Sequence, residues 1–177
     1  MGRGAANLEN GTYDSAFHDF DRAIQLNPKL PILRSLRGIA YQHEGQLDSA
    51  FQDYDEAIRL DPMSAPAHVF RCDGHALLGQ VDQALADCSS ALKLDPTSSD
   101  ALVSRAWAYL KAERYTEARA DLDAALQKNA KAAIALYGRG LLEQRDGDTV
   151  AATADLARAK ELKRNIADDV AEYDLKL

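Results

Sequence analysis

The chain has 177 residues, enough for one domain or one short array of repeats. Its 28 Asp and Glu residues outnumber its 21 Lys and Arg residues, and the net charge of −7 argues against binding to duplex nucleic acid, which requires clustered cations. No apolar stretch reaches the ~18 residues of a membrane span, no secretory signal is visible, and two cysteines exclude a disulfide scaffold.

A period of 34 residues runs through the sequence. Pro28, Pro62 and Pro96 are spaced by this interval, and four further series recur five times each. The series are Ala16, Ala50, Ala84, Ala118 and Ala152; Ala23, Ala57, Ala91, Ala125 and Ala159; Arg3, Arg37, Arg71, Arg105 and Arg139; and Asp19, Asp53, Asp87, Asp121 and Asp155. Such a period is typical of a solenoid whose units stack on their neighbours.

Residues 31–62 show the plan of one unit. Apolar residues from Leu33 to Tyr41 recur at helical spacing before Gly45 interrupts the pattern. A second helix is predicted to begin near Asp48, whose carboxylate favours the positive N-terminal end of a helix. Pro62 ends that helix, because the residue before a proline is disfavoured in helical conformation. Each unit is therefore predicted to be helix, tight turn, helix and stop.

The units follow one another along the chain. We expect a single array at 1–177, with a partial first unit at 1–30, further units at 31–64, 65–98, 99–132 and 133–164, and a capping helix at 165–177. Helices are predicted at 33–44, 48–60, 67–78, 82–94, 101–112, 116–128, 134–145 and 149–163, and near 166–175. The first unit begins at its seventh position, which suggests either a fragment of a longer array or an N-terminal face that something else covers.

The last predicted helix has the pattern of a cap. Its apolar residues recur at helical spacing, and acidic residues occupy its other faces. The apolar residues are Ile166, Val170, Tyr173 and Leu177, and the acidic ones are Asp168, Asp169, Glu172 and Asp174. A terminal repeat needs such an outward polar face for solubility.

Small and large residues alternate in the same way in each unit. The small ones at Gly4, Gly38, Ala106 and Gly140 let paired helices approach closely, and large ones such as Tyr54 fill the spaces between helices. With its closing proline, this pattern resembles the tetratricopeptide repeat, in the version RGxAY...G.YD.A..DFD.AI.LDP. The resemblance implies an all-α, right-handed solenoid of stacked antiparallel helix pairs.

Four positions depart from the family pattern. Ala130 and Arg164 stand where earlier units have proline, so we expect less sharply defined helix ends there. Cys72 replaces a small glycine in the third unit, and Glu113 replaces the turn glycine in the fourth.

In this family, ligands bind to fixed positions on the first helices, which line the concave side. Carried onto this chain, these positions predict a binding groove that comprises Ile39, Val69, Asp73, Val103, Trp107, Leu110, Lys111, Tyr137, Leu141 and Arg145. Lys111 and Arg145 are expected at the rim of an apolar, aromatic surface, which suits an apolar peptide segment flanked by acidic residues. The Lys and Asn pair with which some members hold a peptide's terminal carboxylate does not occur here.

Trp107, the only tryptophan, has two possible positions. It could anchor a ligand in the groove, as aromatic residues often do at binding hot spots. It could instead fill the space between helices beside Ala106. Helical periodicity does not separate these two faces, so both alternatives stay open.

The arginine and aspartate series favour a structural interpretation. A ligand site is local, whereas these residues recur in every unit. We expect each arginine on a first helix to face an aspartate on a second helix and to form a ladder of charge-assisted bonds between repeats.

The third unit contains the one cluster with potential metal chemistry. His68, Cys72 and His75 share one helical face, and Cys88 lies on the partner helix. Two histidines and two cysteines could hold zinc, and the cysteines could form a disulfide. Because all four occupy positions that are core in the other units, we favour buried side chains, with free cysteines packed as small hydrophobic residues.

No motif of a catalytic site appears in the sequence. The sequence therefore predicts a non-catalytic adaptor or assembly scaffold with a protein or peptide partner, without a cofactor, bound metal, nucleic acid or membrane span. Three alternatives stay open: a metal- or redox-responsive switch at the third unit, self-association through the incomplete N-terminal repeat, and a fragment of a larger protein with an effector domain. Neither the partner nor the compartment follows from the sequence.

Overall fold

A computed structural model describes residues 2–171, 173 and 175, and of Glu9 only the backbone; this part of the chain contains eleven helices and no strand. The helices are α1 (Gly2–Glu9), α2 (Tyr13–Leu26), α3 (Pro31–His43), α4 (Leu47–Leu60), α5 (Ala65–Leu77), α6 (Val81–Leu94), α7 (Ser99–Lys111), α8 (Tyr115–Lys128), α9 (Ala133–Arg145), α10 (Thr149–Leu162) and α11 (Ile166–Ala171). Each helix predicted up to residue 163 begins and ends within two residues of its expected position.

The last helix is shorter than the sequence pattern predicts. Helix α11 ends at Ala171 instead of near residue 175, and Tyr173 lies in a turn beyond it. Ile166, Val170 and Tyr173 are buried, as expected for the apolar side of a cap. Glu172, Asp174 and Leu177 of the predicted cap lie outside the described residues.

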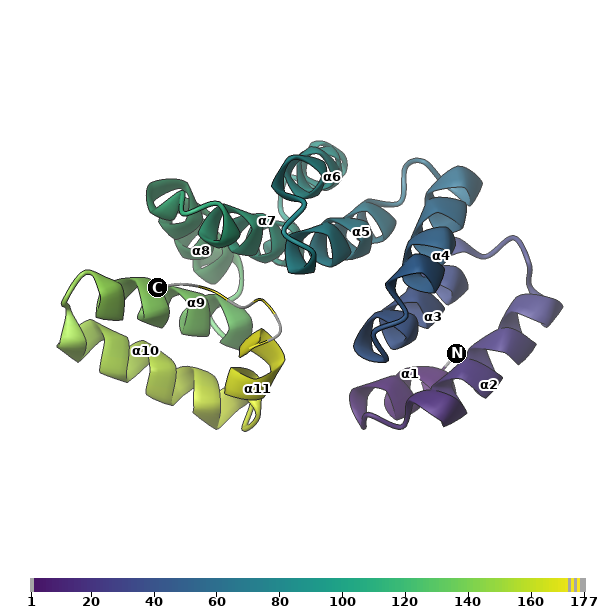
Figure 1. Ribbon diagram of the computed structural model, residues 1–177, viewed down its shortest axis with the longest axis horizontal. Coiled ribbons are helices and arrows are strands. Elements are labelled where there is room, and N and C mark those ends of the chain that lie inside the picture. Colours follow the sequence, from purple (N-terminus) through teal and green to yellow (C-terminus); the bar gives the residue numbers. More distant parts are fainter. Residues whose placement is uncertain (1, 172, 174, 176–177) are drawn as a thin grey trace.

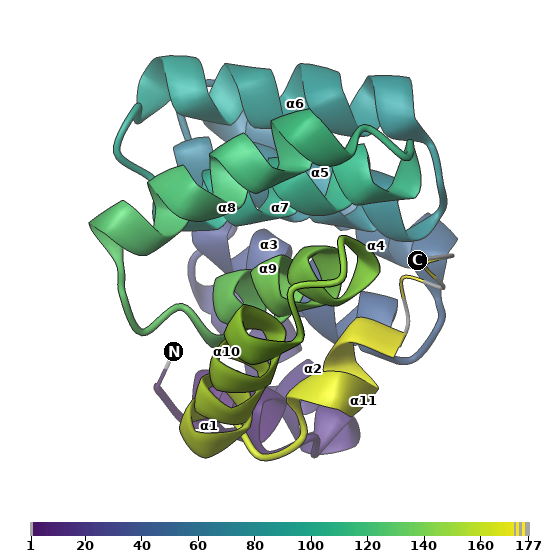
Figure 2. The same cartoon turned by 90° about the vertical axis from the view of Figure 1, so that its left-hand side faces the viewer.

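The helix pairs form an arch (Figure 1). The pairs α1–α2 and α9–α10 lie at its two ends, and α11 lies on its inner side. First helices contact the first helices of neighbouring pairs, as α3 does with α5 and α5 with α7, whereas each second helix contacts the next first helix. Helix α6 accordingly lies outside α5 and α7 in both views (Figures 1 and 2). The inner side of α3, α5, α7 and α9 is called the concave face below.

Close approach of paired helices depends on small residues, as the sequence predicted. A Cβ atom on Gly38 of α3 would lie 2.5 Å from Cε1 of Tyr54 on α4, closer than two carbon atoms can approach. Tyr54 itself is fully buried. The missing side chain of Gly38 thus makes room for the tyrosine ring that fills the space between α3 and α4.

The arginine series binds aspartates within its own unit. Arg37 Nε and Nη2 donate to the carboxylate of Asp53 at 2.7 Å each, and Arg71, Arg105 and Arg139 make the same bidentate contact sixteen residues ahead. The expectation that this aspartate series links neighbouring repeats is therefore wrong. An arginine and the aspartate sixteen residues after it instead join the two helices of one pair.

A second aspartate series, which the sequence analysis did not single out, makes the contacts between units. Arg37 Nη1 donates to Asp21 of the preceding unit at 2.6 Å. The corresponding pairs are Arg71 with Asp55 at 2.7 Å and Arg139 with Asp123 at 3.0 Å. Ser89 occupies this position next to Arg105, so the third and fourth units lack the carboxylate at this point.

Cys72 on α5 and Cys88 on α6 form a disulfide, with their Cα atoms 5.4 Å apart. Both residues are fully buried, as expected, but the preference for free thiols is wrong. The disulfide was considered but not favoured, because sixteen residues separate the cysteines and only the packing of α5 on α6 brings them together. Arg71 and Asp87 directly precede these cysteines in the sequence, and the same packing of α5 on α6 brings them into hydrogen-bond contact.

The histidines of the third unit have partners of their own. His68 Nε2 lies 3.2 Å from the carbonyl oxygen of Pro62, and His75 Nδ1 lies 2.6 Å from Oε1 of Gln80. Disulfide-bonded sulfur atoms are not thiolate ligands, so the arrangement does not assemble the four-ligand zinc site considered above. Within the described residues, no group of three or more His, Cys, Asp or Glu side chains is placed to hold a metal ion.

The longest helices in the described part of the chain have 14 residues. None of the described helices is long and apolar enough to cross a membrane.

Candidate functional site

The predicted groove residues separate by exposure on the concave face. One group is partly exposed, a second group is buried beneath it, and Arg145 is exposed at the end of α9. The partly exposed residues are Ile39, Asp73, Lys111, Tyr137 and Leu141, and the buried ones are Val69, Val103, Trp107 and Leu110. The ten positions therefore do not form one continuous accessible surface.

A hollow of about 230 Å³ lies on the concave face between α3, α5 and the segment that contains α11. We call it the concave hollow. Apolar side chains form much of its wall, and charged side chains from α5, α11 and the end of α10 reach its edge. Its lining includes Ile39, Phe70, Leu77 and Ile134 together with Asp73, Lys163, Asp169, Val170 and Tyr173. Of the predicted groove residues, Ile39 and Asp73 both line this hollow.

Trp107 is a buried residue in this structure. Its side chain is 0% exposed, and the ring of Tyr173 stacks on it with 4.7 Å between ring centroids and an angle of 30° between ring planes. Of the two positions left open for Trp107, the structure has the buried one, so Trp107 is not an open anchor of the groove. The covering residue comes from the predicted cap, which the sequence analysis assigned only to solubility.

Two charged residues of the concave face bind the same tyrosine. The hydroxyl of Tyr173 donates a hydrogen bond to the carboxylate of Asp73 on α5. The ammonium group of Lys111 on α7 donates to the backbone carbonyl of Tyr173. Asp73, Trp107 and Lys111 therefore form one subsite, which recognises the ring, the hydroxyl and the backbone of a single residue.

Buried polar groups hold the wall of the hollow in place. The hydroxyl of Tyr54 donates to Oε1 of Gln42 at 3.0 Å, and both residues lie beside the hollow. Burial raises the pKa of Tyr54 well above its usual range, and the charges of Asp73 and Asp53 raise it further. Tyr54 therefore remains a protonated hydrogen-bond donor.

Arg145 does not reach the subsite of Tyr173. Its guanidinium carbon lies 3.8 Å from the ring centroid of Tyr115, and Nη1 pairs with Asp146 at 2.9 Å. These contacts place it against the turn before α8. Val69 also lies away from the subsite of Tyr173, because it packs with Ala91 and Ala101 between units.

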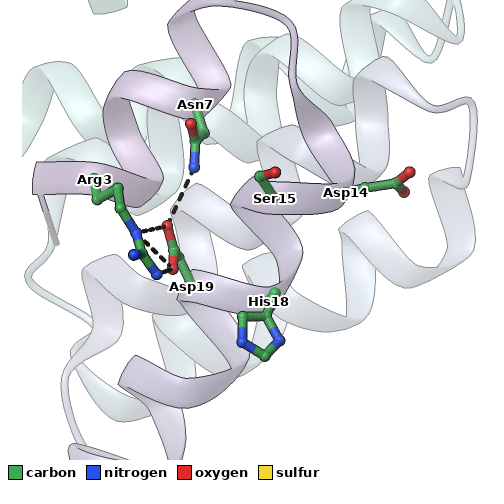
Figure 3. A pocket seen from close by; sticks show the side chains of 6 residues that line it. All are labelled: Arg3, Asn7, Asp14, Ser15, His18 and Asp19. Carbon is green, nitrogen blue, oxygen red and sulfur yellow. Dashed lines mark hydrogen bonds and ion pairs between the residues drawn. The ribbon is translucent and has the colours of Figure 1, made fainter.

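A second hollow, of about 460 Å³, lies on the N-terminal face (Figure 3). We call it the N-terminal hollow; its lining residues are Arg3, Asn7, Asp14, Ser15, His18 and Asp19. The side chain of Arg3 is 78% exposed, whereas that of Arg37, which two units enclose, is 19% exposed. The hydrogen bond from Arg3 lowers the pKa of Asp19 below its usual range.

Comparisons with known proteins agree with the repeat architecture. Two family models, both described as tetratricopeptide repeat, match residues 35–99 and 75–136, which together span more than half of the chain. No curated protein sequence matches the chain significantly.

Several solved structures share the fold. The crystal structure of TTC0263, a thermophilic TPR protein of Thermus thermophilus, has a TM-score of 0.85 at 19% identity, over 98% of this chain and 95% of that chain. MamA from Desulfovibrio magneticus RS-1 (residues 41 to the end) has a TM-score of 0.66 at 18% identity, over 93% of each chain. The Arabidopsis OM64 TPR domain has a TM-score of 0.61 at 27% identity, over 66% of this chain and 96% of that chain.

The paired helices, the 34-residue period and the two model matches lead to the same assignment. This chain belongs to the tetratricopeptide repeat family, whose helical solenoids generally serve as non-catalytic scaffolds for protein interactions.

Proposed function

We propose that this chain is a non-catalytic adaptor or assembly scaffold that binds a protein or peptide on its concave face. The observation that carries the proposal is the subsite of Asp73, Trp107 and Lys111, which holds the side chain and the backbone of one residue. The family assignment supports protein interaction in general. Because many functions share one fold, the choice of surface rests on this site and not on the family.

The proposed contact residues are the partly exposed ones, of which Asp73 and Lys111 bind Tyr173 in this structure. They are Ile39, Asp73, Lys111, Tyr137 and Leu141. Val69, Val103 and Leu110 support this surface from below, and Trp107 becomes part of it when Tyr173 moves away. Arg145 is proposed to contact only a partner that extends as far as the turn at Tyr115.

A substitution within the concave hollow tests the choice of surface. Ile39→Asp places an uncompensated carboxylate against the apolar wall, and we expect it to weaken binding of a partner by about 2 kcal/mol or more. Val150→Asp is the matched control, because Val150 is 82% exposed at the beginning of α10 and does not line the hollow.

The partner for this experiment is obtained by cross-linking to the wild-type chain and is then titrated as purified protein. Calorimetry with the wild-type chain and both variants measures the difference in affinity. A partner that binds Ile39→Asp as tightly as wild type would remove the concave face from the proposal. Circular dichroism of each variant shows whether the solenoid is retained.

Self-association is a second candidate function, which the N-terminal hollow favours. In Arg37, Arg71 and Arg139 the guanidinium binds an aspartate of the preceding unit, and the exposed Arg3 offers the same group to another molecule. Helix α10 carries Ala157 at the position of that aspartate. A second copy that stacks head to tail therefore supplies no carboxylate, and two copies would meet through their N-terminal faces.

The mass in solution distinguishes this second candidate from the first. Self-association through the N-terminal hollow predicts a dimer by light scattering that Arg3→Glu converts to monomer, while Ile39→Asp leaves the dimer unchanged. A wild-type monomer at concentrations of about 100 μM, far above the Kd of a stable interface, would reject it.

A further inference from the structure

Tyr173 binds to the concave face in the way that a residue of a bound peptide would. Its ring stacks on Trp107, its hydroxyl donates to Asp73, and its carbonyl accepts from Lys111. Asp73 and Lys111 belong to different units, so the tyrosine bridges the third and fourth repeats. Asp73 and Tyr173 are 100 residues apart in the sequence, which means that this contact is made across the arch and not along it.

The segment around Tyr173 is short and is held chiefly by apolar contacts, since Ile166, Val170 and Tyr173 are all buried. Helix α11 has only six residues, and among the helices it contacts α9 and α10. Lys163, at the C-cap of α10, binds Asp169 at 2.5 Å, so this ion pair holds α11 to the end of α10. Separation of Tyr173 from its subsite breaks its contacts with Trp107, Asp73 and Lys111, so a competing segment must restore these contacts to replace it.

The segment also leaves one polar atom of the subsite without a partner. Nε1 of Trp107 is buried and has no hydrogen-bond acceptor among the described residues. Most buried polar atoms in proteins do have a partner, and a buried donor without one is destabilising. A segment from another molecule that supplies a carbonyl or carboxylate oxygen here has an advantage over α11 and Tyr173.

The chemistry of the segment matches that of the surface it covers. Ile166, Val170 and Tyr173 supply buried apolar contacts, and Asp168 and Asp169 place negative charge beside them. Lys163 at the end of α10 pairs with Asp169, and Lys111 binds the backbone carbonyl of Tyr173. The concave hollow remains next to Tyr173, with Ile39 in its wall. The hollow gives a competing segment room to make its first contacts while Tyr173 is still bound.

From these contacts we infer that α11 and Tyr173 are a built-in, displaceable occupant of the concave face. The inference rests on the proposed function and specifies the partner: it carries an aromatic residue next to acidic residues, and this aromatic residue takes the place of Tyr173 between Trp107, Asp73 and Lys111. Binding of the partner and attachment of the segment exclude each other. The chain is consequently inhibited by its own residues until the partner is present in sufficient concentration.

The test uses the full chain and a labelled peptide of residues 163–177, KRNIADDVAEYDLKL. The variant Tyr173→Ala empties the subsite, and Tyr115→Ala is the matched tyrosine control at the outer turn. Trp107 is the only tryptophan, so its fluorescence reports on the subsite directly. We expect the emission of Tyr173→Ala to shift to longer wavelength and the added peptide to reverse the shift, whereas Tyr115→Ala resembles wild type.

Peptide affinity supplies the second measurement. Anisotropy should show at least tenfold tighter binding of the peptide to Tyr173→Ala than to wild type, because the wild-type subsite is already occupied. A peptide with alanine in place of its tyrosine should bind Tyr173→Ala at least tenfold more weakly. Equal affinity of wild type and Tyr173→Ala, or of the two peptides, would overturn the inference.

Two further controls distinguish a failure of the inference from a folding defect and from a failure of the proposed function. Should Tyr173→Ala lose its helical circular dichroism, Tyr173→Phe replaces it, since this change removes only the hydroxyl that donates to Asp73 and leaves the subsite intact for the peptide; a gain in peptide affinity is again expected, and no gain would contradict the inference. If partner binding depends on Ile39 but not on the state of Tyr173, the inference fails and the proposed function stands. If partner binding is insensitive to Ile39→Asp, the concave face itself is wrong.

Discussion

At the level of single residues, the turn at Glu113 carries local strain. Glu113 has a φ of 57°, and the corresponding turns contain Gly11, Gly45, Gly79 and Gly147 with φ between 69° and 85°. A side chain in the left-handed region costs about 1–2 kcal/mol, because its Cβ approaches the neighbouring carbonyl oxygen. The turn therefore keeps its geometry in the fourth unit although the residue that suits it is absent.

Glu113→Gly is accordingly expected to stabilise the protein. The relief of strain exceeds the extra backbone entropy of glycine in the unfolded chain, which leaves a gain of about 0.5–1 kcal/mol in the free energy of unfolding. Urea titration measures this difference. The reciprocal change Gly45→Ala should lower the free energy of unfolding, and a loss of stability in Glu113→Gly would show that Glu113 makes compensating contacts.

Trp107 is the residue whose removal should cost the most stability. It is fully buried, and Trp107→Ala leaves a cavity under Tyr173 that the surrounding helices fill only in part. We expect a loss of about 3–5 kcal/mol in the free energy of unfolding. Thermal melting measures it, with Val150→Ala as an exposed control that should stay within about 0.5 kcal/mol of wild type.

At the level of the helices, the Cys72–Cys88 disulfide joins α5 and α6 around a loop of sixteen residues. A cross-link of this length stabilises a protein by about 3 kcal/mol, chiefly by restricting the unfolded chain. Both cysteines are fully buried, so a reductant reaches the sulfur atoms only when the pair of helices opens.

Reduction under native conditions should therefore be slow, and the reduced protein should melt at lower temperature. The variant with both Cys72→Ala and Cys88→Ala should have the lower melting temperature with or without reductant. Rapid reduction of the folded protein, followed by a change in partner affinity, would instead support the redox switch that the sequence left open.

The charge ladder between helices is interrupted where the third unit meets the fourth. Arg105 binds Asp121 of its own unit, and Ser89 stands where the equivalent arginines find a second aspartate. Ser89→Asp should add an ion pair worth about 0.2–1 kcal/mol that weakens as salt concentration rises. Ser90→Asp on the next position of α6 is the control; equal stabilities of the two variants would show that Arg105 does not bind the new carboxylate.

At the level of the whole molecule, stability should vary along the arch because each unit contacts mainly its neighbours. Helix α7 contacts α5, α6, α8 and α9, whereas α1 has eight residues and contacts α2. We expect hydrogen exchange to show that amides of α1 and α2 open at lower free energy than those of α7 and α8. Uniform protection across all pairs would mean that the array unfolds as a single cooperative unit.

Much of the architecture follows from the sequence alone. Helix positions from 31 to 162 were predictable within two residues, because the apolar period, the turn glycines and Pro28, Pro62 and Pro96 act locally. The small residue at Gly38 also indicated the close approach of α3 to α4. These features depend on neighbours in the chain, so the repeat pattern determines them.

The candidate site was only partly predictable. The family positions selected Asp73 and Lys111, which both bind Tyr173, and Ile39, which lines the hollow beside them. They also selected Trp107 without showing that Tyr173 covers it. The aspartate that Arg37, Arg71 and Arg139 bind in the preceding unit was missed for a related reason, since Asp21 and Asp53 both lie sixteen residues from Arg37.

The sequence by itself determined the units, their helices and the chemistry of the concave positions. Only the tertiary structure decided that Cys72 meets Cys88, that Arg37 binds two aspartates, and that Tyr173 lies on Trp107. The physical reason is the same in each case. Helical periodicity determines which side chains share a face of one helix, but the group that each face meets depends on how helices far apart in the chain pack together.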